Sequence, residues 1–289
     1  MKPFLRCVGA SLFGALLLAQ EPARQAPQAV GAPAVQAASK RYETNAWPRG
    51  AVRAGVDLAA IVLPGFAGGA IERLGPGPVQ RFFADAGRVD RVLVEVHVGD
   101  DVDAAQRHLL GWLAHVSSPG LVPTSASAGI PLGDVGFIGW SKPSANRIAW
   151  LAFVRDNVAV RVVCLDPSVD PHPDLAACAQ LVDAAVGREA LVAAKALPPR
   201  PDVTMFRAER ATCRAGDKVP LAVGVDVAAG AATLRFEVDG PGQGYVEGDG
   251  KGGHVLCTTG PGRVTVRLVA TGARCTSTTT SVQVDVGPR

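Results

Sequence analysis

The sequence predicts an α+β domain, in which helices cover one face of an antiparallel sheet, followed by an all-β sandwich. Two breaks divide the chain of 289 residues. Residues 20–40 consist mainly of Ala, Pro and Gln, which predicts a disordered spacer. Residues 197–201 carry three prolines, which is typical of an extended linker. Residues 41–196 mix helical and strand patterns, whereas in residues 202–289 apolar and polar side chains alternate.

The first domain contains two helical stripes among several alternating runs. Asp100 or Asp101 can cap the first helix, and Asp174 can cap the last. Asp156 and Asn157 tolerate positive φ, so a hairpin is expected to turn there. The expected elements are a strand at 91–98, a helix at 101–116, strands at 121–128, 134–140, 147–154 and 158–165, and a helix at 174–186. This order predicts an antiparallel sheet with both helices on one face.

The second domain has a period of two almost everywhere. Each short alternating run predicts a strand with one buried face, and Gly-rich turn signals separate the runs. About seven strands in fewer than 90 residues favour a β-sandwich. The clearest strands are expected at 221–227, 232–238, 264–268 and 282–286.

Four segments of this domain carry a resemblance. AGDKVPLAV, TLRFEVDGPG, GPGRVTVRLVA and TSTTTSVQVDV together resemble a bacterial immunoglobulin-like domain. The resemblance implies a fold and no chemistry. In the first domain, IVLPGFAGG, IPLGDVGF and FVRDNVAVRV are similar to an uncharacterised group of secreted bacterial domains, which implies no functional residue.

Residues 1–19 have the layout of a secretory signal peptide. Lys2 and Arg6 precede an uncharged, leucine-rich stretch, and Ala19 is the expected residue before the cut. The alternative is an uncleaved anchor, but an apolar core of about 12 residues is shorter than the ~20 that a spanning helix needs. We therefore expect a secreted or periplasmic protein, with no membrane span after cleavage of the signal.

The net charge is only +3, and most of the excess lies in the first 40 residues. Nucleic-acid binding requires Lys and Arg gathered on one surface, and the chain has no basic run. Nucleic acid is not an expected partner, and no motif predicts a cofactor.

Export would leave five cysteines in an oxidising compartment. Cys164 lies on the inward alternation of the hairpin and Cys178 on the apolar side of the next helix, so a disulfide between them is predicted. An immunoglobulin-like topology would place Cys213 and Cys257 at the same end, which implies a second disulfide and leaves Cys275 free. The alternative for the first pair is two small buried apolar residues.

The densest polar group is the segment DPSVDPHPD, with Asp166, Ser168, Asp170, His172 and Asp174. Its oxygens could bind calcium, and the imidazole could join a softer metal. The alternative is a proline-rich turn whose last aspartate caps a helix, and the sequence favours this alternative.

Three histidines are candidates for a second metal site. His97 lies in the strand at 91–98, and His108 and His115 share one side of the following helix. That side is far from the apolar stripe, so His108 and His115 are expected to face water.

The sequence therefore favours a non-enzymatic exported protein, an interaction module with a protein or cell-surface partner. One alternative is a metal-dependent hydrolase that uses the loop from Asp166 to Asp174. Another is a polysaccharide-binding protein, for which Trp140, at the end of a strand, is the one tryptophan expected to contact a ligand.

Overall fold

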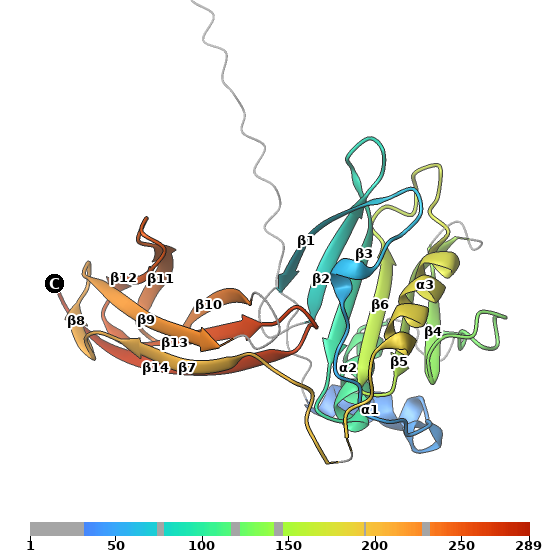
Figure 1. Cartoon of the computed structure of the whole chain (residues 1–289), viewed down its shortest axis with the longest axis horizontal. Coiled ribbons are helices and arrows are strands. Elements are labelled where there is room, and N and C mark those ends of the chain that lie inside the picture. The colour runs from blue at the N-terminus through green and yellow to red at the C-terminus, as the bar shows by residue number, and fades with distance from the viewer. Residues whose placement is uncertain (1–31, 74–77, 117–121, 142–146, 194, 227–231) are drawn as a thin grey trace, which may run out of the picture.

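The computed structural model describes residues 32–73, 78–116, 122–141, 147–193, 195–226 and 232–289. The expected signal peptide lies outside the described residues. The chain is mostly β-structure and forms two bodies side by side (Figure 1). One contains a six-stranded sheet and the other contains two four-stranded sheets. No helix in the described part of the chain is long and apolar enough to cross a membrane.

The six-stranded sheet is antiparallel throughout, as expected. Its spatial order is β1-β2-β3-β6-β5-β4. The long hairpin is confirmed, and Asp156 in its turn has a φ of 55°. The strands are β1 (Ala67–Arg73), β2 (Val79–Ala84), β3 (Asp90–Val98), β4 (Val135–Trp140), β5 (Ile148–Arg155) and β6 (Val158–Cys164).

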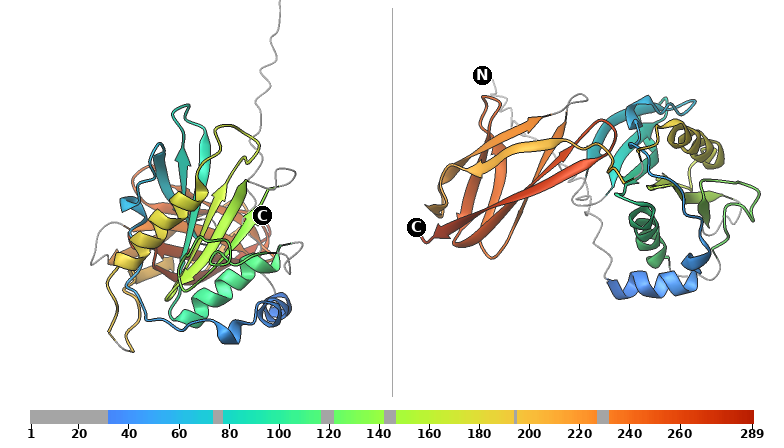
Figure 2. Two further views of the ribbon diagram at one scale, coloured as in Figure 1. Left: turned by 90° about the vertical axis from the view of Figure 1, so that its right-hand side faces the viewer. Right: turned by 60° about the horizontal axis from the view of Figure 1, so that its bottom comes forward.

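The prediction that the helices cover one face is wrong, because α2 (Val102–Ala114) and α3 (Leu175–Arg188) pack on opposite faces of the sheet (Figure 2). Along β5, Phe153 packs in the cluster that contains α3, whereas Val154 packs with α2. The central strands are apolar on both sides, as expected of strands buried between two layers.

Both expected helix caps are present. The Asp101 carboxylate accepts a hydrogen bond from the N–H of Ala104 at 2.7 Å. Asp174 does the same for the N–H of Ala177 at 3.0 Å. Each satisfies a backbone donor that the first helical turn would leave unpaired.

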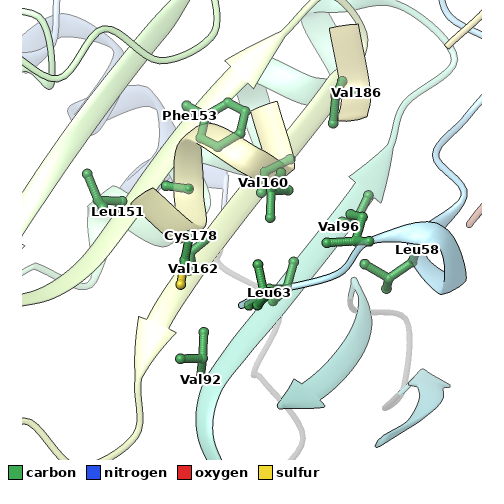
Figure 3. Packing of buried hydrophobic residues seen from close by; sticks show 14 of the residues in the cluster. Leu58, Leu63, Val92, Val96, Leu151, Phe153, Val160, Val162, Cys178 and Val186 are labelled. Carbon is green, nitrogen blue, oxygen red and sulfur yellow. The ribbon is translucent and has the colours of Figure 1, made fainter. Parts of the chain in front are cut away.

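The segment before β1, which contains only short 3-10 helices after α1, completes the core on the α3 side. Figure 3 shows Leu58 and Leu63 of this segment beside Val92 and Val96 of β3, next to the part of the sheet that α3 covers. Leu58 belongs to the short 3-10 helix η2 (Leu58–Ala60), and η1 (Thr44–Ala46) precedes it. This segment covers the β1–β2–β3 part of the same face, which α3 does not reach.

Three local expectations differ from the structure. Part of the expected spacer forms the helix α1 (Ala32–Arg41), whose Ala38 is buried with α2. The expected strand at 121–128 is a single bridge at Thr124 followed by a turn. The strands β1 and β2 were missed, because glycines and arginines interrupt their alternation.

The second body consists of two sheets that share one core cluster. The sheet orders are β10-β13-β14-β8 and β11-β12-β9-β7, and all pairings are antiparallel except that of β8 with β14. The strands are β7 (Asp202–Ala208), β8 (Thr212–Arg214), β9 (Lys218–Asp226), β10 (Thr233–Asp239), β11 (Gln243–Gly248), β12 (His254–Gly260), β13 (Gly262–Thr271) and β14 (Ser277–Gly287).

The turn between β13 and β14 inserts into the first body. Cys275 at this turn is buried in the core cluster that contains β3 and α3. The N–H of Val56 donates to the carbonyl of Arg274 at 2.9 Å, and Arg274 pairs with Glu189. Gly55 has a φ of 134°, and a Cβ there would collide with the Arg274 carbonyl. The two bodies therefore share interior contacts in addition to the linker.

Candidate functional site

The expected polar loop does not converge on a point. The carboxylate of Asp166 accepts from the backbone N–H and the hydroxyl of Ser168, which closes a local turn. The Ser168 hydrogen bonds lower the pKa of Asp166. Asp174 is engaged as the α3 cap. These carboxylates are used by the loop itself.

The remaining two side chains of the loop contact residues at or just before the start of β5. Asp170 forms an ion pair with Arg147 at 2.7 Å. The Nε2 of His172 lies 3.1 Å from the carbonyl oxygen of Ile148, and its Nδ1 lies 3.9 Å from the sulfur of Cys164. Within the described residues, no group of three or more His, Cys, Asp or Glu side chains could hold a metal ion.

The expectation that His108 faces water is wrong. Its ring stacks on that of His97, with centroids 4.0 Å apart and planes 4° from parallel. Trp112 meets His108 edge-on at 4.6 Å. Burial lowers the pKa of His97 to about 4 and, helped by His97 and Arg161, that of His108 to about 2. Both rings are therefore neutral at pH 7.

A polar row crosses the α2 face of the sheet beside these rings. Glu95 in β3 is buried, and it accepts hydrogen bonds from the amide of Gln80 at 2.7 Å and from the guanidinium of Arg161. Arg161 also lies over the Trp112 ring, 5.2 Å from its centroid. Both oxygens of the Glu95 carboxylate are therefore paired, as a buried carboxylate requires.

A second polar cluster surrounds the β5–β6 turn. Arg155 forms a bidentate pair with Asp183 of α3 at 2.6 and 2.8 Å. The carboxylate of Asp156 pairs with Arg53. The backbone N–H of Asp156 donates to the carboxylate of Asp134 at 2.6 Å. Burial raises the pKa of Asp134. Each carboxylate is held by a cation or a backbone donor, so the cluster fixes the turn against α3.

The five described cysteines are free thiols. Cys164 and Cys178 share the α3-side core, and their pairing stays a prediction. The pairing of Cys213 with Cys257 also stays a prediction. Cys213 packs against the core of the second body, whereas Cys257 lies beside Tyr245 on the opposite face of its sheet.

The second body contains an open pocket of about 310 Å³, whose lining side chains are mostly aliphatic and whose accessible surface is nearly half polar. It lies between β9 and β10 and is bounded by the tip of the β11–β12 hairpin. The ring of Phe236 lies 4.4 Å from His254 and 6.2 Å from Phe206, which links the pocket to the core. The lining residues are Leu221, Val223, Val225, Ala232, Leu234, Gly252, Gly253 and His254.

Register explains why the pocket stays open. β12 pairs with β9 only as far as His254 opposite Leu221. The following part of β9, residues 222–226, pairs with β7 alone among the described residues. The aliphatic side chains beyond Leu221 therefore lack the cover that β12 gives to the first half of the strand, and Val223 and Val225 are only half-buried.

Sequence reasoning found the strands that line this pocket but not the pocket itself. Alternation in β9 and β10 correctly predicts that Val223 and Leu234 point to the same interior. In the sequence, the only sign of the early end of β12 is the run of glycines in the segment GDGKGG at residues 248–253.

A comparison with known protein families and with curated proteins finds no match to this chain.

Proposed function

We propose that this protein is an exported, non-enzymatic binding protein whose immunoglobulin-like second domain binds an apolar group of a protein or cell-surface partner. The signal-like residues 1–19 support export. Two four-stranded sheets around one core support the immunoglobulin-like assignment, and the first sheet with α2 and α3 supports an α+β domain.

The pocket carries the proposal. Five of its eight lining residues are aliphatic, two are glycines, and His254 is the single titratable one. Its volume of about 310 Å³ exceeds the ~150 Å³ of a cavity that accommodates benzene. The aliphatic side chains favour contact with an apolar group, and the polar part of the surface can form hydrogen bonds to polar atoms beside that group. The lining side chains supply no acid, base or nucleophile pair.

The two alternatives have less support. A hydrolase would need the loop from Asp166 to Asp174 to present free carboxylates, and these are occupied by Ser168, Arg147 and the α3 terminus. A polysaccharide platform would need exposed aromatic rings in a row. Trp140 and Tyr245 are 43% and 53% exposed but belong to different bodies.

The test is titration of the full chain with the apolar fluorophore anilinonaphthalene sulfonate. We expect one saturable site that Val223→Asp and Leu234→Asp abolish, because a charge in an apolar pocket opposes hydrocarbon binding. Val62→Asp, on the exposed surface of the first domain, is the matched control. Ala232→Phe fills the pocket without adding a charge. It shows whether the aspartate variants lose binding because the pocket is blocked or only because the protein unfolds. Unchanged fluorescence with Ala232→Phe and Val223→Asp would refute the proposal.

A further inference from the structure

We propose that the pocket binds an extended polypeptide segment by strand addition, with the segment pairing antiparallel to residues 222–226 of β9 and inserting alternate apolar side chains. This inference rests on the proposed function, because it requires that the pocket bind an apolar group. It adds the chemical class of the partner, a peptide backbone with apolar residues at every second position.

The first argument is the direction of the backbone groups of β9. The N–H of Glu209 donates to the carbonyl oxygen of Pro220, so Pro220 directs its carbonyl toward the β7 side. Successive residues of a strand direct their N–H and C=O groups to alternate sides. Leu221, Val223 and Val225 therefore direct theirs toward β12.

The second argument is that β12 is absent where two of these residues lie. Leu221 is opposite His254, the first residue of β12. Beyond it, the hairpin tip turns back on itself through the hydrogen bond from Asp249 N–H to Gly253 O at 3.0 Å. In the described part of the chain, Val223 and Val225 thus present unpaired donors and acceptors on this side. Such an edge is a template for another strand.

The third argument is the coincidence of edge and pocket. The residues with free backbone groups on the β12 side, Val223 and Val225, are also pocket-lining residues. In an antiparallel pair, residues directly opposite each other place their side chains on the same face of the sheet. A strand added here would aim every second side chain between β9 and β10, toward Leu234. A lipid chain would fill the pocket but leave the N–H and C=O groups unpaired, so these groups favour a peptide.

In the experiment, the capped synthetic peptide TVTVKVT is titrated into the full chain, and isothermal titration calorimetry measures its affinity. We expect binding that is lost when the three valine nitrogens are methylated, because the inward residues of an antiparallel partner donate to β9. Methylation of the alternate nitrogens should leave affinity within about twofold. Equal effects of the two methylation patterns would overturn the inference, as would absence of peptide binding.

A protein variant separates this inference from the proposed function. Val225→Pro removes one N–H on the free side and keeps the pocket apolar, whereas Val225→Ile keeps the N–H. We expect Val225→Pro to weaken peptide binding at least about fivefold, the equivalent of one hydrogen bond, and Val225→Ile to leave it unchanged. Both variants should still bind anilinonaphthalene sulfonate. Fluorophore binding without peptide binding in the parent chain would reject strand addition and leave the apolar site standing, and loss of both would reject both.

Discussion

The β5–β6 hairpin of the first body and strands β9 and β10 of the second differ in how completely their apolar side chains are covered. Phe153 and Val160 are fully buried because both lie on the face of the sheet that α3 covers. Val223 and Leu234 are only half-buried, since the neighbouring strand ends early. The comparison shows that the strands of the first body are fully covered, whereas the described end of β9 leaves apolar surface half-exposed.

The largest expected effect is in the core of the first body. Phe153→Ala should lower the free energy of unfolding by about 3–5 kcal/mol, because a fully buried ring leaves a cavity. Phe236→Ala, next to the pocket, should cost about half as much, since its ring is already partly exposed. Urea unfolding of both variants checks the contrast. Equal losses would mean that the two interiors are equally packed.

Gly55→Ala should cost about 3 kcal/mol. Its φ of 134° is unfavourable for a residue with a Cβ, and the added methyl group would meet the Arg274 carbonyl of the second body. The matched control is Gly129→Ala, which has a φ of 76° and open space around the new methyl group. We expect the control to cost about 1–2 kcal/mol in the same denaturation experiment. A Gly55 variant no worse than the control would show that the inserted turn contributes little.

The stacked histidines should make the folded chain acid-sensitive. Their pKa values of about 4 and about 2 lie below the value of 6.5 for a free imidazole. As the pH falls below 6.5, the unfolded state therefore binds more protons than the folded state. The contribution of the two rings to stability is therefore fully present above pH 6.5. It falls as the pH drops toward 4, by up to about 1.4 kcal/mol per pH unit for each ring. The charged groups that disfavour protonation are Arg73, Arg161 and Arg200.

Thermal melts of the parent chain and of His108→Phe between pH 7 and pH 4.5 measure this effect. The phenylalanine keeps an aromatic ring against His97 and removes one titrating group, so its pH dependence should be shallower. Identical slopes would assign the acid sensitivity to groups other than this pair.

The smallest expected effect concerns the polar loop. Asp174→Ala should cost about 1 kcal/mol, the value of a helix N-cap, because the N–H of Ala177 loses its acceptor. Asp174→Asn preserves an acceptor and should be nearly neutral. Chemical denaturation with and without added calcium completes the test, since a loop that binds calcium would show a stabilisation that either substitution changes.

Local signals predicted much of the fold. The caps Asp101 and Asp174 and the turn at Asp156 depend on nearest-neighbour chemistry, and all three were correct. The position of α2 was not predictable, because a strand that is apolar on both faces does not show which helix covers which face. The helix α1 was missed because Ala-rich sequence is helical here only in contact with α2.

The candidate site was harder to predict for the same reason. Alternation indicates that Val223 and Leu234 face an interior, but the exposure of that interior depends on where β12 stops. In the same way, His108 lies off the apolar stripe of its helix, and only the register of β3 places His97 beside it. Both features depend on pairing between segments distant in sequence.

The most direct test of the account is amide hydrogen exchange of the full chain at single-residue resolution, with and without the TVTVKVT peptide. We expect the N–H groups of Val223 and Val225 to exchange much faster than those of Phe153 and Val160, and to become protected when the peptide is bound. Strong protection of Val223 and Val225 in the free chain, or no change on adding the peptide, would contradict the assignment of this strand edge as the binding site.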